Sequence, residues 1–126
     1  MTLEKINLDF SVCKLNKDFN IKDVDFTRQF VFLSKTDEEV SLVCESSHIP
    51  KDAEKVENGW KAFRIAGTLD FGMIGVIANL SSILAKADIS VFVVSTYDTD
   101  YIFVKDYNYE KAQAALEDAL CQILQI

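Results

Sequence analysis

The chain has 126 residues, of which 49% are hydrophobic, and its formal net charge is −7. This length fits one domain or two small subdomains with a real core. The negative charge disfavours binding to a nucleic-acid backbone or an anionic membrane surface. No apolar run approaches the length that spans a membrane. We therefore expect neither nucleic acid nor a membrane as a partner.

The cysteines and the single histidine give no sign of a metal site. Cys13, Cys44 and Cys121 lie far apart without a CxxC pair, and His48 is the only histidine, so no zinc site and no cofactor are predicted. Each cysteine is expected to act as a small apolar filler. Their low, odd number is typical of a reducing compartment. Because the N-terminus also lacks an apolar signal segment, we expect a cytoplasmic protein.

The N-terminal half is predicted to consist of strands. Residues 8–16 partly alternate apolar and polar side chains, and the apolar runs 28–33 and 40–44 flank a charged turn, which is typical of a hairpin. Residues 45–59 are polar and contain the only proline, Pro50. They form the best internal boundary, and another alternating segment, 60–66, follows. We predict two domains, 1–58 and 59–126.

Two helices and two strands are expected in the C-terminal half. Residues 74–87 carry apolar side chains at helical spacing, and a second helix is predicted for 109–124. Between them, the near-continuous apolar character of 89–96 predicts a central strand, and 101–104 should return antiparallel to it. With the strand before the first helix, the order is β-α-β-β-α.

A possible ligand site lies at two loops of this region. A glycine-bearing loop, Asp70–Gly75, opens the first helix, whose unpaired N–H groups suit a carboxylate. The acidic turn that ends at Asp100 suits an amine, so the two together could hold a zwitterion such as a free amino acid. Gly75 could instead allow close packing of the helix, and Asp100 could instead bond its own backbone in a turn.

The segments GWKAFRI (59–65), GTLDF (67–71), GVIA (75–78), LAKADISVF (84–92) and STYDTDYIFV (95–104) resemble the ACT domain. More narrowly, they resemble tandem ACT-type proteins related to the cytosolic arginine sensors of animals. The resemblance implies an α+β fold of two ferredoxin-like βαββαβ units, the first degenerate, with an antiparallel sheet and helices on one face. It also implies a small amino acid bound where two units meet, here in a homodimer. By this resemblance the ligand-binding residues are Met73, Ile74, Gly75, Ser90, Val91, Thr96, Tyr97 and Asp100.

Our first functional hypothesis is a non-catalytic regulatory module that senses a free amino acid. The alternative is an interaction module that only holds oligomers together by its sheet edges and helix faces. An enzyme is not predicted, since Ser95 and Thr96 have no base placed nearby and His48 lies in the polar segment. The chain also has no phosphate-binding loop of the P-loop type. We therefore assign no catalytic residue.

Overall fold

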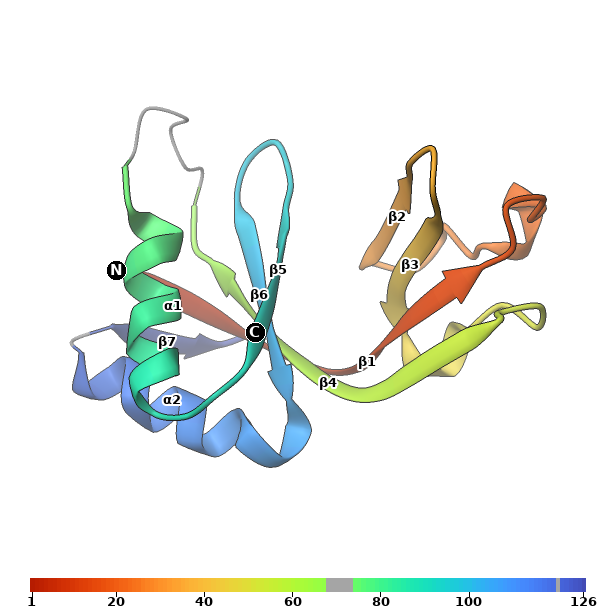
Figure 1. The fold of residues 1–126 in the computed structure, drawn as a ribbon. Helices are drawn as coiled ribbons and strands as arrows, with labels where there is room; N and C mark the ends of the chain where they lie inside the picture. Colours follow the sequence, from red (N-terminus) through yellow and green to blue (C-terminus); the bar gives the residue numbers. More distant parts are fainter. Residues whose placement is uncertain (68–73, 120) are drawn as a thin grey trace. The chain divides into compact units, whose positions relative to one another are not determined.

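The computed structural model describes residues 1–67, 74–119 and 121–126 (Figure 1). The chain divides into two compact units, one of Met1–Asn7 with Lys61–Ile126 and one of Leu8–Trp60. Two long strands, β1 (Thr2–Leu15) and β4 (Lys55–Ile65), contribute to both units. The first seven residues therefore group with the C-terminal part of the chain. A division into functional domains after residue 58 stays a prediction.

The unit Leu8–Trp60 is built from strands and short turns. Its strand order is β2-β3-β1-β4, with β2 (Val31–Lys35) and β3 (Val40–Glu45) forming an antiparallel hairpin. A backbone hydrogen bond of 2.9 Å from Thr36 N to Glu39 O closes the turn between them. This confirms the hairpin predicted from the two apolar runs. The 3-10 turns η1 (Ile21–Asp23) and η2 (Ser46–His48) complete the unit.

The polar segment 45–59, predicted as the best internal boundary, contains the start of a strand. Strand β4 begins at Lys55, and the preceding Glu54 N donates to Lys14 O at 2.8 Å. The side chains of residues 55–58 are exposed, so backbone pairing with β1 holds this part of the strand. A strand without buried side chains gives no hydrophobic alternation, which explains why the sequence pattern missed it.

The other unit has an α+β fold with an antiparallel sheet and two helices. After β4 come α1 (Val76–Lys86), β5 (Val91–Ser95), β6 (Asp100–Lys105), the 3-10 turn η3 (Asp106–Asn108), α2 (Tyr109–Asp118) and β7 (Gln122–Gln125). Its strand order is β7-β1-β4-β6-β5, in which β1 lies between β7 and β4. Strands β5 and β6 pair antiparallel, whereas β7 pairs parallel with β1. The predicted β-α-β-β-α order is confirmed and continues into β7.

The last helix is shorter than predicted, because α2 ends at Asp118 and does not continue to 124. Residues 122–125 form β7 instead, with Gln122 N donating to Met1 O at 2.9 Å. Ile123 of this strand and Cys121, directly before it, still pack against the core. The apolar spacing of the segment is therefore compatible with either structure. Pairing with β1, which is remote in sequence, decides between them.

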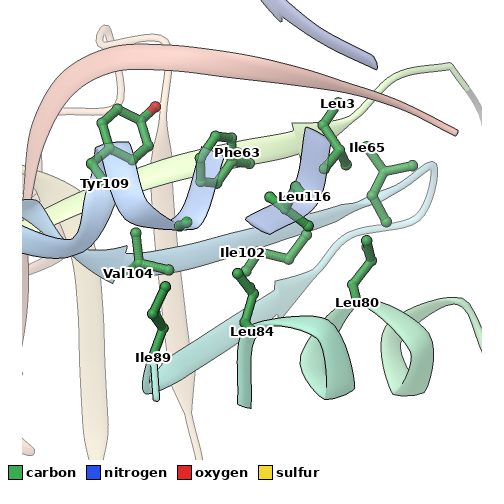
Figure 2. Close-up of a cluster of buried hydrophobic side chains, with 11 residues drawn as sticks. Leu3, Phe63, Ile65, Leu80, Leu84, Ile89, Ile102, Val104, Tyr109 and Leu116 are labelled. Carbon is green, nitrogen blue, oxygen red and sulfur yellow. The ribbon is translucent and has the colours of Figure 1, made fainter. Parts of the chain in front are cut away.

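Both helices cover the same face of the sheet in this unit, as predicted. Figure 2 shows Leu80 and Leu84 of α1 and Leu116 of α2 packed toward Phe63, Ile65 and Ile102 of the strands. Along α1, Leu80 lies next to Ile65, and Ile89, just after the helix, lies next to Val104. The direction of α1 relative to the sheet is thereby set. The core cluster comprises Leu3, Phe63, Ile65, Leu80, Leu84, Ile89, Ile102, Val104, Tyr109, Ala112 and Leu116.

Strand β5 is an edge strand, which corrects the prediction of a central strand for 89–96. It ends the strand order, and among the described residues β6 is its paired neighbour. Its four apolar residues, Val91–Val94, are partly buried. The helices cover one side chain face, and Phe92 stacks on Phe103 on the other, with ring centroids 4.6 Å apart. The apolar run of β5 is therefore found in a strand with a paired neighbour on one edge only among the described residues.

Candidate functional site

The first backbone N–H groups of α1 have no acceptor within the helix itself. Gly75 is the N-cap, with φ 77° and ψ 11°, and its carbonyl accepts the N–H of Asn79 at 2.9 Å. Among the described residues, no side chain caps this end of the helix. A Cβ built at Gly75 would meet no described atom within 4 Å. Glycine is therefore favoured here by its left-handed backbone, and close packing of the helix does not explain it.

The β5–β6 turn is held by its own threonines. Thr96 N donates to Thr99 O at 2.8 Å, and the Thr96 hydroxyl donates to the same carbonyl at 3.1 Å. Thr99 is buried, and its hydroxyl donates to Ile65 O at 2.8 Å, which fixes the turn to the end of β4. Tyr97, at the tip, is 81% exposed. The turn is thus rigid at its base and open at its tip.

Asp100 has a local partner. It lies opposite Ser95 in the β5–β6 register, and the Ser95 hydroxyl donates to its Oδ1. This differs from the bond to its own backbone that the turn pattern offered as an alternative. A carboxylate has about four acceptor positions, so Asp100 retains capacity to accept a hydrogen bond from an ammonium group.

The helix start and the turn lie at the same end of the unit. The turn is bonded to Ile65 through Thr99, and Leu80, one turn into α1, packs beside the same Ile65. Figure 1 shows the first turn of α1 and the β5–β6 turn at this end. Ile74, directly before Gly75, is 96% exposed. The structure therefore groups Ile74, Gly75, Thr96, Tyr97 and Asp100, whereas Met73 lies outside the described residues.

Ser90 and Val91 lie at the opposite end of β5. Val91 pairs with Val104, whereas Ser95, beside the turn, pairs with Asp100. Val91 and Ser95 are about 13 Å apart along the strand. Ser90 and Val91 line an open groove of about 630 Å³ between α1 and the start of β5. The groove is lined by Ala78, Ser81, Ser82, Ala85, Asp88, Ile89, Ser90 and Val91. The predicted ligand-binding residues thus form two groups within one chain.

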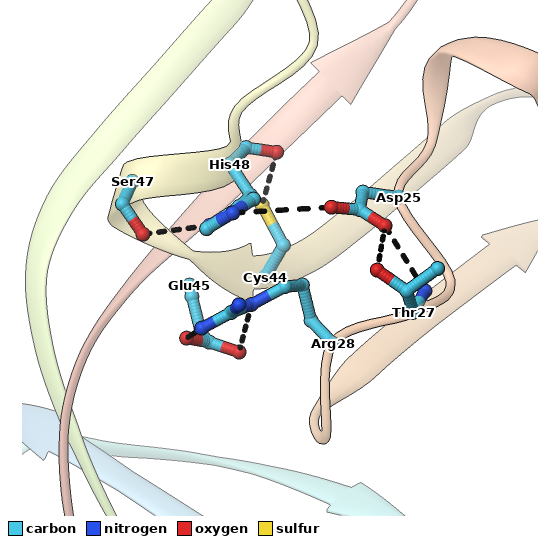
Figure 3. Close-up of polar contacts among 7 residues, drawn as sticks. All are labelled: Asp25, Thr27, Arg28, Cys44, Glu45, Ser47 and His48. Atoms are coloured by element: carbon cyan, nitrogen blue, oxygen red, sulfur yellow. Dashed lines mark hydrogen bonds and ion pairs between the residues drawn. The ribbon is translucent and has the colours of Figure 1, made fainter.

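A polar cluster in the unit Leu8–Trp60 was missed by the sequence reasoning (Figure 3). The Ser47 hydroxyl lies 2.7 Å from His48 Nδ1, and Asp25 Oδ2 lies 3.8 Å from His48 Nε2. The longer distance is not a hydrogen bond, so Asp25 does not orient the imidazole as a catalytic carboxylate does. Hydrogen bonds from Thr27 are the main cause that lowers the Asp25 pKa. The contacts join residues from separate turns, and no sequence motif signals them.

Arg28 and Glu45 form a second contact in this cluster. Arg28 Nη2 lies 3.0 Å from Glu45 Oε1, and Glu45 is only 4% exposed. The bond to Glu45 raises the pKa of Arg28. The pair satisfies a buried carboxylate and is a structural feature of β3.

The residues that the structure describes contain no group of His, Cys, Asp or Glu side chains suited to a metal ion. None of the helices among them is both long and apolar enough to cross a membrane.

Comparison with known proteins identifies the class of this fold. The family model of the ACT domain matches residues 55–118, which is about half of the chain, and a model of an N-terminal domain matches residues 9–52. No curated protein matches the sequence. The chain belongs to the ACT domain family.

Several solved structures share the fold. A protein from Agobacterium tumefaciens has 31% identity and a TM-score of 0.87, over 99% of this chain and 92% of that one. A Vibrio cholerae protein of unknown function, described as a possible transport protein, has 22% identity and a TM-score of 0.71, over 93% and 88%. The regulatory subunit of aspartate kinase from Thermus thermophilus has 8% identity and a TM-score of 0.65, over 93% and 95%. This chain thus shares its fold with a regulatory subunit of aspartate kinase.

Proposed function

We propose that this protein is a cytoplasmic regulatory module that binds a free amino acid between two copies of the chain. Membership of the ACT family and the fold shared with an aspartate kinase regulatory subunit support a ligand-binding regulatory role. The likeness to animal arginine sensors remains part of the proposal. The edge strand supports the contact with a second copy. The two groups of candidate residues support the binding of a ligand.

The observation that carries the proposal is the apolar edge of β5. Its sequence, Val-Phe-Val-Val-Ser, has no charge and no proline, which are the usual devices that keep edge strands from pairing. The Thr96–Thr99 bond fixes which residues of β5 exchange backbone hydrogen bonds with β6. Because hydrogen-bonded and non-hydrogen-bonded pairs alternate, the N–H and C=O groups of Val91, Val93 and Ser95 point away from β6. They are available to another strand.

A two-fold contact through β5 would join the two groups of candidate residues. Antiparallel pairing centred on Val93 places Val91 opposite Ser95 of the partner subunit and Ser90 opposite Thr96 of the partner subunit. The helix start and turn of one copy would then meet the groove end of the other. A site that is divided within one chain becomes continuous across the pair.

The chemistry of these groups fits a zwitterion. The open N–H groups after Gly75 would accept an α-carboxylate, and Asp100, at the base of the turn, would accept the α-ammonium group. Ile74 and Tyr97 would cover an aliphatic part of the ligand, while Ser90, Val91 and Thr96 would shape the pocket. A ligand held by both copies stabilises the paired state by its preference for that state.

The test combines thermal unfolding with a measurement of mass in solution. We expect a free amino acid from a complete panel to raise the unfolding temperature in a concentration-dependent manner, and sedimentation to show a dimer that the same amino acid strengthens. A dimer with no response to the panel would instead support the ligand-free interaction module, which the apolar edge also favours. A monomer with no response would refute both.

A further inference from the structure

Cys13 and Cys44 lie on neighbouring strands of the unit Leu8–Trp60. In the antiparallel register of β1 and β3, Cys13 is opposite Leu42, and Cys44 is opposite Ser11. Cys44 is two residues beyond Leu42, so it is the diagonal neighbour of Cys13, and alternation places both side chains on the same face of the sheet. The two cysteines belong to one core cluster and are 1% and 3% exposed.

The two thiols also influence each other's protonation. The Cys44 side chain is the main cause that lowers the pKa of Cys13, and the Cys13 side chain is the main cause that raises the pKa of Cys44. Cys44 Sγ additionally lies 3.9 Å from the carbonyl oxygen of His48, within the same unit (Figure 3). The contact with the His48 carbonyl gives the Cys44 thiol a donor role, which keeps the proton on Cys44. The pair is therefore asymmetric, with Cys13 the better nucleophile.

We propose that Cys13 and Cys44 are a reversible oxidation site that closes to a disulfide between β1 and β3. The oxidant is hydrogen peroxide. The Cys13 sulfur attacks one peroxide oxygen, the O–O bond breaks, and Cys13 sulfenic acid and water form. The Cys44 sulfur then attacks the Cys13 sulfur, the S–O bond breaks, and the disulfide and a second water form. Two thiols are oxidised and one peroxide is reduced.

The register sets what this closure requires. Diagonal neighbours on paired strands have Cα atoms roughly 7–8 Å apart, whereas disulfides span Cα separations of about 4.4–6.8 Å. Closure therefore needs the two strands to approach each other locally, together with rotation about the side-chain bonds. The bond would close a loop that contains η1, β2 and the turn before β3. In a reducing compartment such a disulfide is a transient, regulatory state. Oxidation would therefore fasten the outer hairpin of this unit to β1.

Cys121 provides an internal control. It is the third cysteine and lies in the other unit, half-buried and away from β1 and β3 in sequence. An oxidation that depends only on exposure would affect Cys121 first. An oxidation that depends on the neighbouring thiol would select Cys13 and Cys44.

The experiment treats the reduced full chain with hydrogen peroxide under native conditions, then alkylates free thiols and maps the peptides by mass spectrometry. We expect two of the three thiols to be lost, the Cys13 and Cys44 peptides to be linked, and dithiothreitol to reverse the link. Cys121→Ser should give the same result. Cys44→Ser should abolish the link and allow dimedone to trap sulfenic acid at Cys13, whereas Cys13→Ser should give no such adduct at Cys44.

Three results would overturn the proposal. They are the absence of a linked peptide in the folded chain, a link that forms only in urea, and a link that involves Cys121. Circular dichroism of each serine variant before treatment establishes that it is folded. The wild-type chain needs no substitution, so its result is independent of any folding defect.

Discussion

Replacing Val93 by proline tests the edge contact at the centre of β5. The N–H of Val93 points away from β6, by the alternation set by the Thr96–Thr99 bond. Proline therefore removes a donor from the free edge without removing a β5–β6 hydrogen bond. A substitution at this position weakens the contact between copies selectively.

The magnitude follows from the pairing. Two β5 strands paired about Val93 exchange roughly six backbone hydrogen bonds, two for each of three residue pairs. Proline at residue 93 in both copies removes about two of them, at a net cost of about 0.5–1.5 kcal/mol each. The total of about 1–3 kcal/mol weakens the dimer by about 5- to 150-fold. The proline ring adds steric repulsion at the two-fold axis, so this is a lower bound.

Sedimentation equilibrium of the wild type, Val93→Pro and Val93→Ala measures the effect. The alanine variant is the matched control because it also loses the side chain that packs against the core but keeps the N–H. We expect the alanine variant to dimerise like the wild type and the proline variant to be largely monomeric at the same concentration. Equal dimer affinities for the proline variant and the wild type would refute pairing through β5.

Three further substitutions test the site and the core. Asp100→Asn should weaken amino-acid binding, measured by calorimetry, by about 10- to 150-fold, since a hydrogen bond to a charged group contributes about 1.5–3 kcal/mol. The control Asp98→Asn, in the same turn, should change the affinity little. Gly75→Ala should lower the free energy of unfolding by about 1–2 kcal/mol because φ is positive, and Gly75→Asn should cost less in urea titrations. Tyr109→Phe should lower the free energy of unfolding by about 1–3 kcal/mol, because the buried Tyr109 hydroxyl lies 2.6 Å from Ala62 O. Tyr107 is exposed, so Tyr107→Phe should leave the free energy of unfolding nearly unchanged. Burial raises the pKa of Tyr109 in the folded chain, so the phenol of the unfolded chain ionises at a lower pH. The free energy of unfolding of the wild type should therefore fall above about pH 10, and that of Tyr109→Phe should fall less.

Much of the C-terminal fold could be predicted from local patterns. The apolar spacing of 74–87 gave α1, and the runs around the STYDTDY turn gave β5 and β6. Strand β7 could not be predicted in the same way, because its apolar residues also continue the stripe of α2. Its conformation is decided by pairing with residues 2–5, about 120 positions earlier in the chain. Likewise, the exposed start of β4 depends on hydrogen bonds to β1 and has no hydrophobic pattern.

The candidate site was only partly predictable for the same reason. A glycine before a helix and an acidic turn can be recognised locally, and the structure places them at one end of the unit. The strand predicted for 89–96 already separates Ser90 and Val91 from the turn, and the structure bears out this separation along β5. The position of Cys13 and Cys44 as diagonal neighbours depends on the register of β1 and β3, and a sequence separation of 31 residues does not indicate it.

The apolar composition of β5 is unusual for an edge strand, which is why 89–96 was predicted to be central. A near-continuous apolar run indicates a strand that is covered on its faces and edges. In β5 one side-chain face packs against the core with the helices, and on the other face Phe92 stacks beside its cross-strand partner Phe103. Among the described residues, β6 pairs with only one edge of β5. An isolated chain gains nothing from an uncharged free edge and risks unspecific pairing. The sequence pattern of β5 is therefore the one expected of a strand whose second neighbour comes from another copy, and that neighbour would also unite the divided ligand-binding residues.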